Sequence, residues 1–267
     1  MIILTFVKNS SKTIDDTIFS LESQSLKNIK WIILDDNSTD NTLDKIYKSS
    51  IDKEIIKISS SGLFNAYNIS HDLLRKRNYN DVIFFLHSDD IIYNNTVLEK
   101  ITFQFNKYRL DSLFGNIFFF KNSQFKFFRS WKNKEKISKL IDENLFLIKK
   151  FEKKDLLTGW TFPHTSFFFH SRILNLLPIY EEDYEFCSDY GWILDIMLQN
   201  KFNIYYYNIN TIKMRFGGKS TKFVNLGKNF FFDFLILKKR FSKSYTDFFF
   251  IIIVLFLKKF RKVLQFF

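Results

Sequence analysis

The sequence predicts an α/β fold in which a mixed, mostly parallel sheet is flanked by helices. Short β-rich runs alternate with helical stretches up to about residue 86, and polar residues follow the ends of these runs. Hydrophobic residues make up 46% and charged residues 25% of the 267 residues, which excludes a disordered chain, a coiled coil and a collagen-like fibre. A chain of this length forms one large domain, or one domain with an appendage.

The first part of the chain has the pattern of repeated strand-helix units. Strands are expected where β-branched and aromatic residues gather, at 2–7, 30–34, 54–58 and 82–86. Helices are expected between and after them, at 13–25, 39–48, 63–75 and 96–106. Open parallel sheets of this kind bind ligands at the carboxyl ends of their strands, so the residues just after each strand are the place to look for a site.

The pattern changes after residue 106. Two further strands are expected at 112–120 and 124–129, and the charged stretch 132–154 is expected to be a helical or irregular connection. A strand at 166–169 and a helix at 190–199 follow. After Gly227 a mixture of Phe, Leu, Ile and Lys has loosely helical spacing, which predicts a catalytic domain over 1–222 and a basic, aromatic-rich helical appendage over 223–267.

The net charge of +12 lies largely at the end of the chain. Residues 228–267 contain nine Lys or Arg against Asp233 and Asp247, a local charge of 9 − 2 = +7. No nucleic-acid-binding motif accompanies these cations, so no nucleic-acid partner is expected. Cations mixed with Phe, Leu and Ile suit an anionic membrane surface, and packing of a C-terminal helix on protein is an equal alternative.

Two further features bear on the compartment. The lone Cys187 excludes an intramolecular disulfide and any zinc site built from cysteines, which favours a reducing compartment. The longest apolar run, 248–257, has ten residues, about half of what a membrane span needs, so no transmembrane helix is expected. We therefore expect a cytoplasmic protein that is peripheral at the inner face of the plasma membrane.

The second expected strand ends in a pair of carboxylates, Asp35 and Asp36, followed by Asn37, Ser38 and Thr39. A carboxylate at a strand end can accept a hydrogen bond from a nucleotide base or a ribose hydroxyl, and a helix N-terminus favours anions. The alternative is that residues 38–40 only cap the next helix and that both carboxylates are solvated.

The fourth expected strand ends in a second acidic pair, Asp89 and Asp90. Mg²⁺ or Mn²⁺ is usually held by one or two carboxylates together with substrate phosphates. One acidic pair at a loop is commonly only solvated. Two such pairs at the ends of strands in one parallel sheet instead favour a metal and nucleotide site.

These motifs, in their order along the chain, resemble the family 2 glycosyltransferases of the GT-A fold, of the small bacterial surface-polysaccharide type. The resemblance covers about residues 1–222. It rests on runs that follow the expected strands or open later elements: 5–9, 35–40, 62–68, 88–90, Gly115 with Asn116, 163–168, 188–190 and 217–220. Each run is a weak signal by itself, and the ordered combination is specific.

The resemblance implies a role for each matching residue. Asp36 would accept from the base of a nucleotide-sugar, Asp89 would contact its ribose or sugar, and Asp90 would bind the Mn²⁺ or Mg²⁺ that bridges the diphosphate. Asp189 matches the catalytic base, since an inverting transfer needs a carboxylate to deprotonate the acceptor hydroxyl; a helix N-cap is its structural alternative. Further substrate contacts are implied for Thr5, Asn9, Asn68 and His164.

Some residues depart from the family pattern or have a simpler explanation. Asn65 and Tyr67 stand where the family often has an acidic residue and a Met, which affects the contacts to the donor sugar. His87, beside the acidic pair, is expected only to shape its loop. Arg215 and Lys219 could reach a diphosphate, but basic residues are abundant in this chain and a structural role is favoured for both.

The resemblance implies a metal-dependent, inverting glycosyltransferase. Its partners would be a nucleotide-diphospho-sugar donor, a UDP-sugar first, and a surface-glycan acceptor carried on a lipid, as in lipopolysaccharide or capsule synthesis. The rival from another class is a non-catalytic nucleotide-binding or membrane-surface module that retains the fold. A nucleotidyltransferase would normally have a glycine-rich phosphate loop after the first strand, and residues 5–11 contain no glycine.

Overall fold

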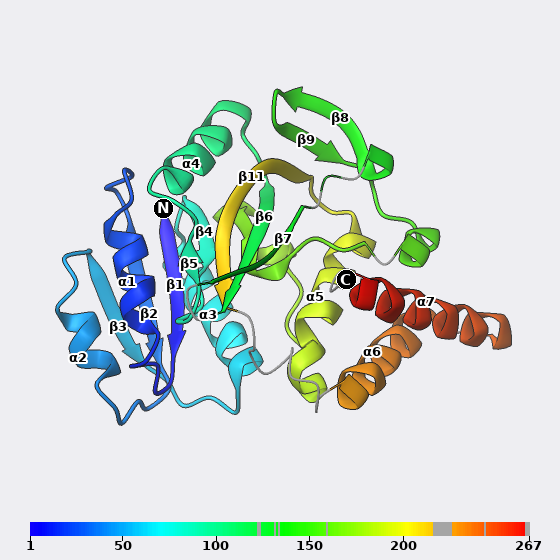
Figure 1. Ribbon diagram of the computed structural model, residues 1–267, viewed down its shortest axis with the longest axis horizontal. Coiled ribbons are helices and arrows are strands. Elements are labelled where there is room, and N and C mark those ends of the chain that lie inside the picture. The colour runs from blue at the N-terminus through cyan, green and yellow to red at the C-terminus, as the bar shows by residue number, and fades with distance from the viewer. Residues whose placement is uncertain are drawn as a thin grey trace. The chain divides into compact units, whose positions relative to one another are not determined.

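The computed structural model describes residues 1–121, 124–130, 132, 134–158, 160–215, 226–242 and 244–264 (Figure 1). The chain divides into two compact units, each made of separate stretches. The first unit contains Met1–Lys149, Pro163–Leu177 and Phe202–Phe216. The second contains Lys150–Phe162, Pro178–Lys201 and Gly217–Phe267. The expected domain boundary at residue 222 lies outside the described residues.

The described strands of the first unit form one sheet of 11 strands, in the order β3-β2-β1-β4-β10-β6-β11-β9-β8, with β5 paired to β11 and β7 to β6. The strands are β1 (Ile2–Val7), β2 (Lys30–Asp35), β3 (Lys53–Lys57), β4 (Val82–Phe85), β5 (Ile91–Ile92), β6 (Ser112–Lys121), β7 (Gln124–Arg129), β8 (Ile137–Asp142), β9 (Leu145–Ile148), β10 (Phe167–His170) and β11 (Ile204–Arg215).

The helices of the first unit cover this sheet. The α-helices are α1 (Ile14–Glu22), α2 (Thr42–Tyr47), α3 (Leu63–Arg77) and α4 (Val97–Tyr108), and the 3₁₀ helices are η1 (Lys134–Lys136), η3 (His164–Ser166) and η4 (Ser171–Leu176). Strands β3, β2, β1 and β4 run parallel, β10 is antiparallel to both β4 and β6, and β6 is again parallel to β11. The predicted mixed sheet flanked by helices is confirmed.

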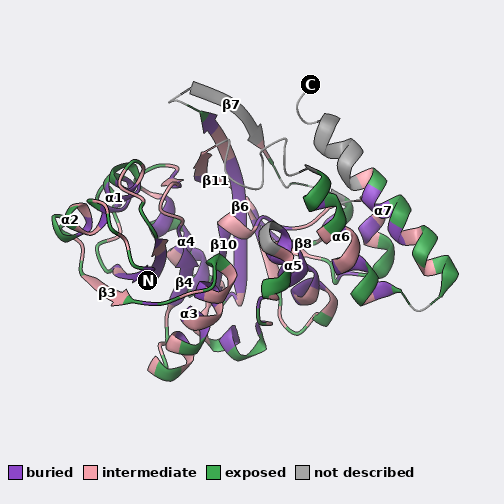
Figure 2. Ribbon diagram, turned by 90° about the horizontal axis from the view of Figure 1, so that it is seen from below, coloured by how far each residue is buried: buried purple, intermediate pink, exposed green. Residues whose placement is uncertain are grey.

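The two faces of the parallel strands pack against different helices because successive side chains alternate across a strand. Ile3, Trp31 and Phe84 belong to a core cluster with buried residues of α1, α2 and α4. Phe6 and Phe85 point to the other face, where both rings contact Tyr67 of α3, with centroids 4.6 and 4.8 Å away. Figure 2 shows central strands such as β4 and β6 buried, and helix surfaces such as that of α2 exposed.

The expectation for the stretch 132–154 was wrong, because most of it forms the hairpin β8–β9. Leu145 and Phe146 of β9 are buried, whereas Lys139 and Leu140 of β8 are exposed. Neither strand alternates strictly between apolar and polar residues, so the stretch lacks the period-two signal of a half-buried strand, and its high charge density favoured a connection. Strand β11 was also missed, although it pairs with both β6 and β9 and so lies inside the sheet.

The second unit is helical. Its elements are η2 (Lys153–Thr158), η5 (Glu182–Cys187), α5 (Ser188–Gln199), α6 (Leu226–Phe241) and α7 (Tyr245–Leu264). Arg240 of α6 links this helix to α5 and to the segment before η5, since its guanidinium donates to the carboxylates of Asp195 and Glu181 while its side chain is only 8% exposed. Within the described ranges, no helix is both long enough and apolar enough to cross a membrane.

Candidate functional site

The two predicted acidic motifs lie at the same edge of the sheet. Asp36 directly follows β2, and Asp89 and Asp90 lie in the loop that leaves β4. Strand β1 lies between β2 and β4 and pairs with both in parallel, so the carboxyl ends of the three strands point the same way. Neighbouring strands are about 4.8 Å apart, which places the two motifs about 10 Å from each other. The first unit thus brings them to one edge.

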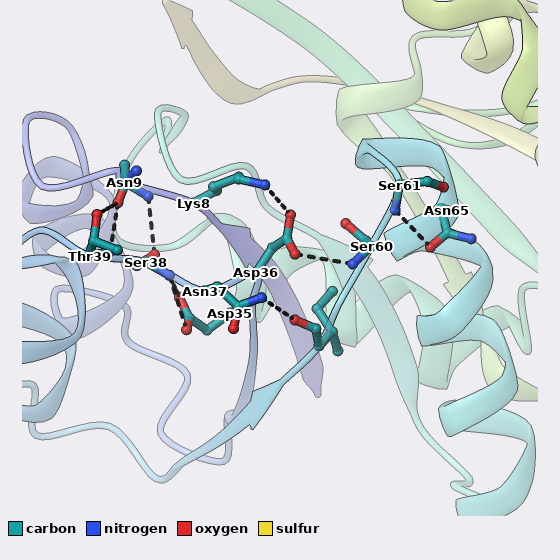
Figure 3. A network of polar contacts seen from close by, with 11 residues as sticks. Lys8, Asn9, Asp35, Asp36, Asn37, Ser38, Thr39, Ser60, Ser61 and Asn65 are labelled. Carbon is teal, nitrogen blue, oxygen red and sulfur yellow. Dashed lines mark hydrogen bonds and ion pairs between the residues drawn. The ribbon is translucent and has the colours of Figure 1, made fainter.

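Asp36 is held as a carboxylate at this edge (Figure 3). One oxygen accepts a hydrogen bond from the Lys8 ammonium at 2.8 Å, and the other accepts from the backbone N–H of Ser60 at 3.1 Å. These hydrogen bonds, that from Lys8 first, lower the pKa of Asp36. The residue is 8% exposed and is not the solvated carboxylate of the alternative interpretation. Lys8, the first cation after β1, was missed by the sequence analysis.

The loops after β1 and β2 are joined by side-chain hydrogen bonds. The Asn9 N–H donates to the Ser38 hydroxyl at 3.1 Å, and the Asn9 carboxamide oxygen accepts from the Thr39 N–H at 2.8 Å (Figure 3). Asn9 and Asn37 have φ of 53° and 56°, in the left-handed region that asparagine tolerates better than most residues. Asn9, a predicted substrate contact, therefore also shapes the loop beside Asp36.

The remaining acidic residues of this segment serve the backbone. Asp35 is 1% exposed and accepts from the Ser38 N–H at 3.1 Å. Asp40 accepts from the backbone N–H groups of Ser11 and Thr42 at 3.1 and 3.0 Å. Hydrogen bonds from the same two residues hold the pKa of Asp40 below its usual range. The alternative interpretation thus describes Asp35 and Asp40 and does not describe Asp36.

His87, Asp89 and Asp90 form a cluster in which each residue offers one ligand atom, and these three atoms all lie within 4.8 Å of one another. Asp90 is 2% exposed, and burial together with the neighbouring Asp89 raises its pKa well above the usual range. A buried carboxyl beside a second carboxyl is costly as an anion unless a cation neutralises it. The donor set fits a divalent ion, and it includes a histidine that the sequence analysis had left to loop shaping.

His87 is oriented by α3. Its Nε2 shares a hydrogen bond of 2.6 Å with the Tyr67 hydroxyl, and its Nδ1 lies 3.6 Å from an oxygen of Asp90. Burial lowers the pKa of His87, so the ring is neutral at physiological pH and keeps a lone pair for a metal. Tyr67 entered the sequence analysis only as a departure from the family pattern, and here it sets the orientation of a candidate ligand.

His164, a predicted substrate contact, joins this group. It is the first residue of η3 and is partly buried. Its ring lies edge-on to the Tyr67 ring, with centroids 5.2 Å apart, and its centroid lies 6.5 Å from that of the His87 ring. Burial first, and then the neighbouring His87 and His71, lower the pKa of His164 to about 3. A neutral imidazole can exchange hydrogen bonds with a sugar hydroxyl but brings no positive charge to a phosphate.

Two other predicted substrate contacts lie at different depths. Thr5 has no exposed surface, and its hydroxyl accepts from the Trp31 indole N–H at 2.9 Å inside the core. Asn68 lies on α3, next to Tyr67, and is partly buried. The contacts of both residues with substrate stay predictions. The sequence did not predict a contact between Thr17 and Asp90. The Thr17 hydroxyl, on α1, donates a hydrogen bond of 2.8 Å to the backbone carbonyl of Asp90.

The later motifs fall in different places. Asp189 belongs to the second unit, in the first turn of α5, where the N-cap residue is Cys187. Its carboxylate accepts from the Tyr190 N–H at 2.8 Å, and its role as base stays a prediction. Arg215 donates to Asp16 at 2.7 Å, and its backbone N–H and its charge oppose the rise in the pKa of Asp90, so its role stays a prediction. The run 217–220, including Lys219, lies outside the described residues.

A separate cavity of about 330 Å³ lies beside α4, lined by Tyr93, Asn94, Val97, Lys100, Asn116, Asn208, Ile209 and Asn210. None of the predicted site residues lines it. Two of its residues, Val97 and Ile209, pack with the core cluster on the face of the sheet that bears α1 and α4. Tyr67 and His164 contact each other on the α3 side, so this cavity is distinct from the acidic edge.

Comparisons with known proteins identify the family and the fold of this chain. A family model described as Glycosyl transferase family 2 matches residues 2–176. Residues 1–349 of S. aureus TarS in complex with UDP-GlcNAc are similar in structure, with a TM-score of 0.65 at 16% identity over 95% of this chain and 70% of that chain. PcManGT, a mannosyltransferase from Pyrobaculum calidifontis in complex with GDP-Man and Mn²⁺, has a TM-score of 0.59 at 9% identity over 96% of this chain and 69% of that chain.

The structural similarities and the family match support different conclusions. The chain spans only 43% of the longer TarS structure, at a TM-score of 0.65 and 16% identity over 97% of this chain. At such identities a structural likeness establishes the fold, which is that of the GT-A glycosyltransferases, and no more. A search of curated proteins found no match. The match over residues 2–176, more than half of the chain, is the finding that reaches beyond the fold.

Proposed function

The chain belongs to glycosyl transferase family 2 and is a glycosyltransferase, and from this premise we propose that it moves a sugar from a UDP-sugar to a hydroxyl of a surface glycan carried on a lipid. The single observation that carries the proposal is the meeting of Asp36 and the His87–Asp89–Asp90 cluster at one edge of the parallel strands. TarS and PcManGT, whose structures are similar, were solved with UDP-GlcNAc and with GDP-Man and Mn²⁺. The acceptor would meet the enzyme at the cytoplasmic face of the plasma membrane.

Asp36 suits the recognition of a base. Its lowered pKa keeps it ionised at neutral pH, so it only accepts hydrogen bonds. Each oxygen of Asp36 accepts one hydrogen bond, one from Lys8 and the other from the Ser60 N–H. A carboxylate can accept about four hydrogen bonds in all. The remaining positions can accept the imide N–H of a uracil. Asp89, partly exposed at the next motif, would accept from ribose or sugar hydroxyls.

Asp90, with Asp89 and His87, would hold a divalent cation. When bound, Mn²⁺ or Mg²⁺ neutralises the charge that develops on the diphosphate as the sugar leaves. The imidazole in this donor set favours Mn²⁺ over Mg²⁺, because Mg²⁺ prefers oxygen ligands throughout. Tyr67 holds His87 in the orientation that directs Nδ1 toward Asp90. His164, neutral at physiological pH, would contact the sugar or the acceptor.

Asp189 would be the general base of a single displacement that inverts the anomeric centre. The acceptor oxygen attacks the anomeric carbon while its proton passes to the Asp189 carboxylate. The bond between the anomeric carbon and the phosphate oxygen breaks, and its electron pair leaves with the nucleoside diphosphate. Asp189→Asn should therefore keep UDP binding and lose transfer, and normal turnover by this variant would remove the assignment.

The first experiment is a thermal-shift panel of nucleoside diphosphates and nucleotide-sugars with and without Mn²⁺, because a bound ligand raises the apparent melting temperature by mass action. We expect UDP-sugars to stabilise the wild type more strongly with Mn²⁺. Asp90→Asn should lose the additional stabilisation that Mn²⁺ gives. The matched control Asp44→Asn, at an exposed position on α2, should keep this stabilisation. Unchanged metal-dependent stabilisation in Asp90→Asn would contradict the metal assignment, and stabilisation without turnover would contradict the proposed reaction.

A further inference from the structure

Helix α7 has large apolar side chains on its outer side. Six of them, spaced three or four residues apart, are exposed, and we call them the apolar stripe: Tyr245 (91%), Phe248 (41%), Phe249 (68%), Ile252 (40%), Ile253 (51%) and Phe256 (68%). Residues at this spacing share one face of a helix. Figure 2 shows exposed and buried residues alternating along α7. An exposed contiguous patch of this kind marks a surface that a partner covers.

The opposite side of α7 is already packed within the second unit. Ile251, Val254 and Leu255 are at most 1% exposed. Lys153 of η2 pairs with the Asp247 carboxylate, and its ammonium lies 5.0 Å from the centroid of the Phe250 ring. The rotation of α7 about its axis is therefore determined by its contacts with α6 and η2. A helix that is apolar all round is normally buried on every side. The stripe is the more exposed side of α7, and of its members Phe248 also lies edge-on to Phe234 of α6, with ring centroids 5.9 Å apart.

Cations precede and follow the stripe along the chain. Lys238 and Lys239 are exposed at the end of α6, shortly before α7 begins, and Lys239 also pairs with Glu181 at 2.6 Å. The sequence continues after Phe256 and Leu257 with Lys258, Lys259, Arg261 and Lys262. The one acidic residue of α7, Asp247, is used by the ion pair with Lys153. Exposed apolar residues between two groups of cations are complementary to a surface that offers anionic headgroups above acyl chains.

From these observations we propose that the apolar stripe inserts into the interfacial layer of an anionic lipid bilayer, with α7 lying in the plane of the membrane. No described helix is suited to crossing a bilayer, in keeping with a helix that lies on it. The proposed membrane contact involves residues of the second unit alone. That this contact brings the enzyme to a lipid-linked acceptor rests on the proposed function.

The test is flotation of the full chain with vesicles of phosphatidylcholine alone or with 30% phosphatidylglycerol. We expect at least about tenfold stronger partitioning to the anionic vesicles, reduced by high salt because headgroup attraction is screened. Replacing three residues of the stripe together (Phe249→Ser, Ile253→Ser and Phe256→Ser) should lower partitioning by at least about tenfold. The matched control replaces three exposed apolar residues of the first unit, of 74%, 63% and 56% exposure: Phe19→Ser, Tyr47→Ser and Phe103→Ser.

The control variant should partition like the wild type, and circular dichroism should show equal helix content in all three proteins. Failure of the wild type to float with anionic vesicles, or undiminished flotation of the stripe variant, would overturn the proposal. Sedimentation equilibrium tests the alternative partner, a second copy of the chain. If the wild type does not bind vesicles but forms a dimer that the stripe substitutions dissociate, the proposal is also overturned. Metal-dependent stabilisation by UDP, measured in parallel, separates failure of this proposal from failure of the proposed function.

Discussion

Gly115→Ala should destabilise the first unit by crowding the bulge where β6 meets β11. The register of the two strands shifts on either side of Asn210. A Cβ on Gly115 would lie 2.3 Å from Thr211 Cγ2 and 2.9 Å from the Ile209 carbonyl oxygen. Both distances are far inside van der Waals contact, and one of the two atoms belongs to the backbone. Glycine is needed here because the two strands approach each other so closely.

The magnitude follows from how little Thr211 can move. Its hydroxyl shares a hydrogen bond of 2.6 Å with Ser166 and donates to the Asn116 carbonyl at 2.9 Å, so turning the side chain away breaks buried hydrogen bonds. Overpacking a filled core costs about 1–3 kcal/mol, and one lost hydrogen bond adds about 1 kcal/mol. The gain from a stiffer unfolded chain offsets at most about 1 kcal/mol. We expect a net loss of roughly 2–3 kcal/mol in the free energy of unfolding.

The assay is equilibrium urea unfolding followed by circular dichroism, with the midpoint and m value compared. Thr211→Ser removes the clashing methyl but keeps the hydroxyl, and by itself should cost about 1 kcal/mol. The double variant should be more stable than the sum of the two single losses by about 1–2 kcal/mol. Gly227→Ala, where no atom lies within 4 Å of the new Cβ, is the matched control and should not destabilise. A stable Gly115→Ala, or strictly additive losses, would refute the reasoning.

Three further predictions concern charge and orientation. Lys8→Met should lower stability by at most about 1 kcal/mol at pH 7. Because the folded pKa of Asp36 is depressed, this stabilisation is present above the unfolded pKa and lost as pH falls through the folded pKa. The stabilities of wild type and variant in urea unfolding should therefore converge at acid pH. Arg240→Lys, which loses the forked contact with two carboxylates, should cost about 2 kcal/mol in thermal unfolding, and an unchanged Tm would contradict this role. Tyr67→Phe should weaken Mn²⁺ binding about tenfold by calorimetry if it orients His87, whereas a merely structural role would leave the affinity for Mn²⁺ unchanged.

The site was partly visible in the sequence. Asp36, Asp89 and Asp90 were found because acidic pairs at the ends of apolar β-rich runs are a local pattern, and parallel pairing then brings the ends of β2 and β4 to one edge. Lys8 and Tyr67 were not found as partners of these motifs. Each lies more than 15 residues from the group that it contacts, and nothing local marks which of many cations or tyrosines will make that contact.

By itself, the sequence determined the order of strands and helices up to residue 108 except for the short strand β5, as well as the two acidic motifs and the family. Hydrophobic periodicity and short polar motifs are properties of neighbouring residues. Only the tertiary structure decided three features: the hairpin β8–β9, the place of β11 between β6 and β9, and the contact of Tyr67 with His87. The same holds for the outer side of α7, since nearly every residue from Phe248 to Leu257 is apolar and the contacts with α6 and η2 decide which of them are left exposed. Long-range pairing and packing depend on the whole chain, and a window of neighbouring residues does not contain that information.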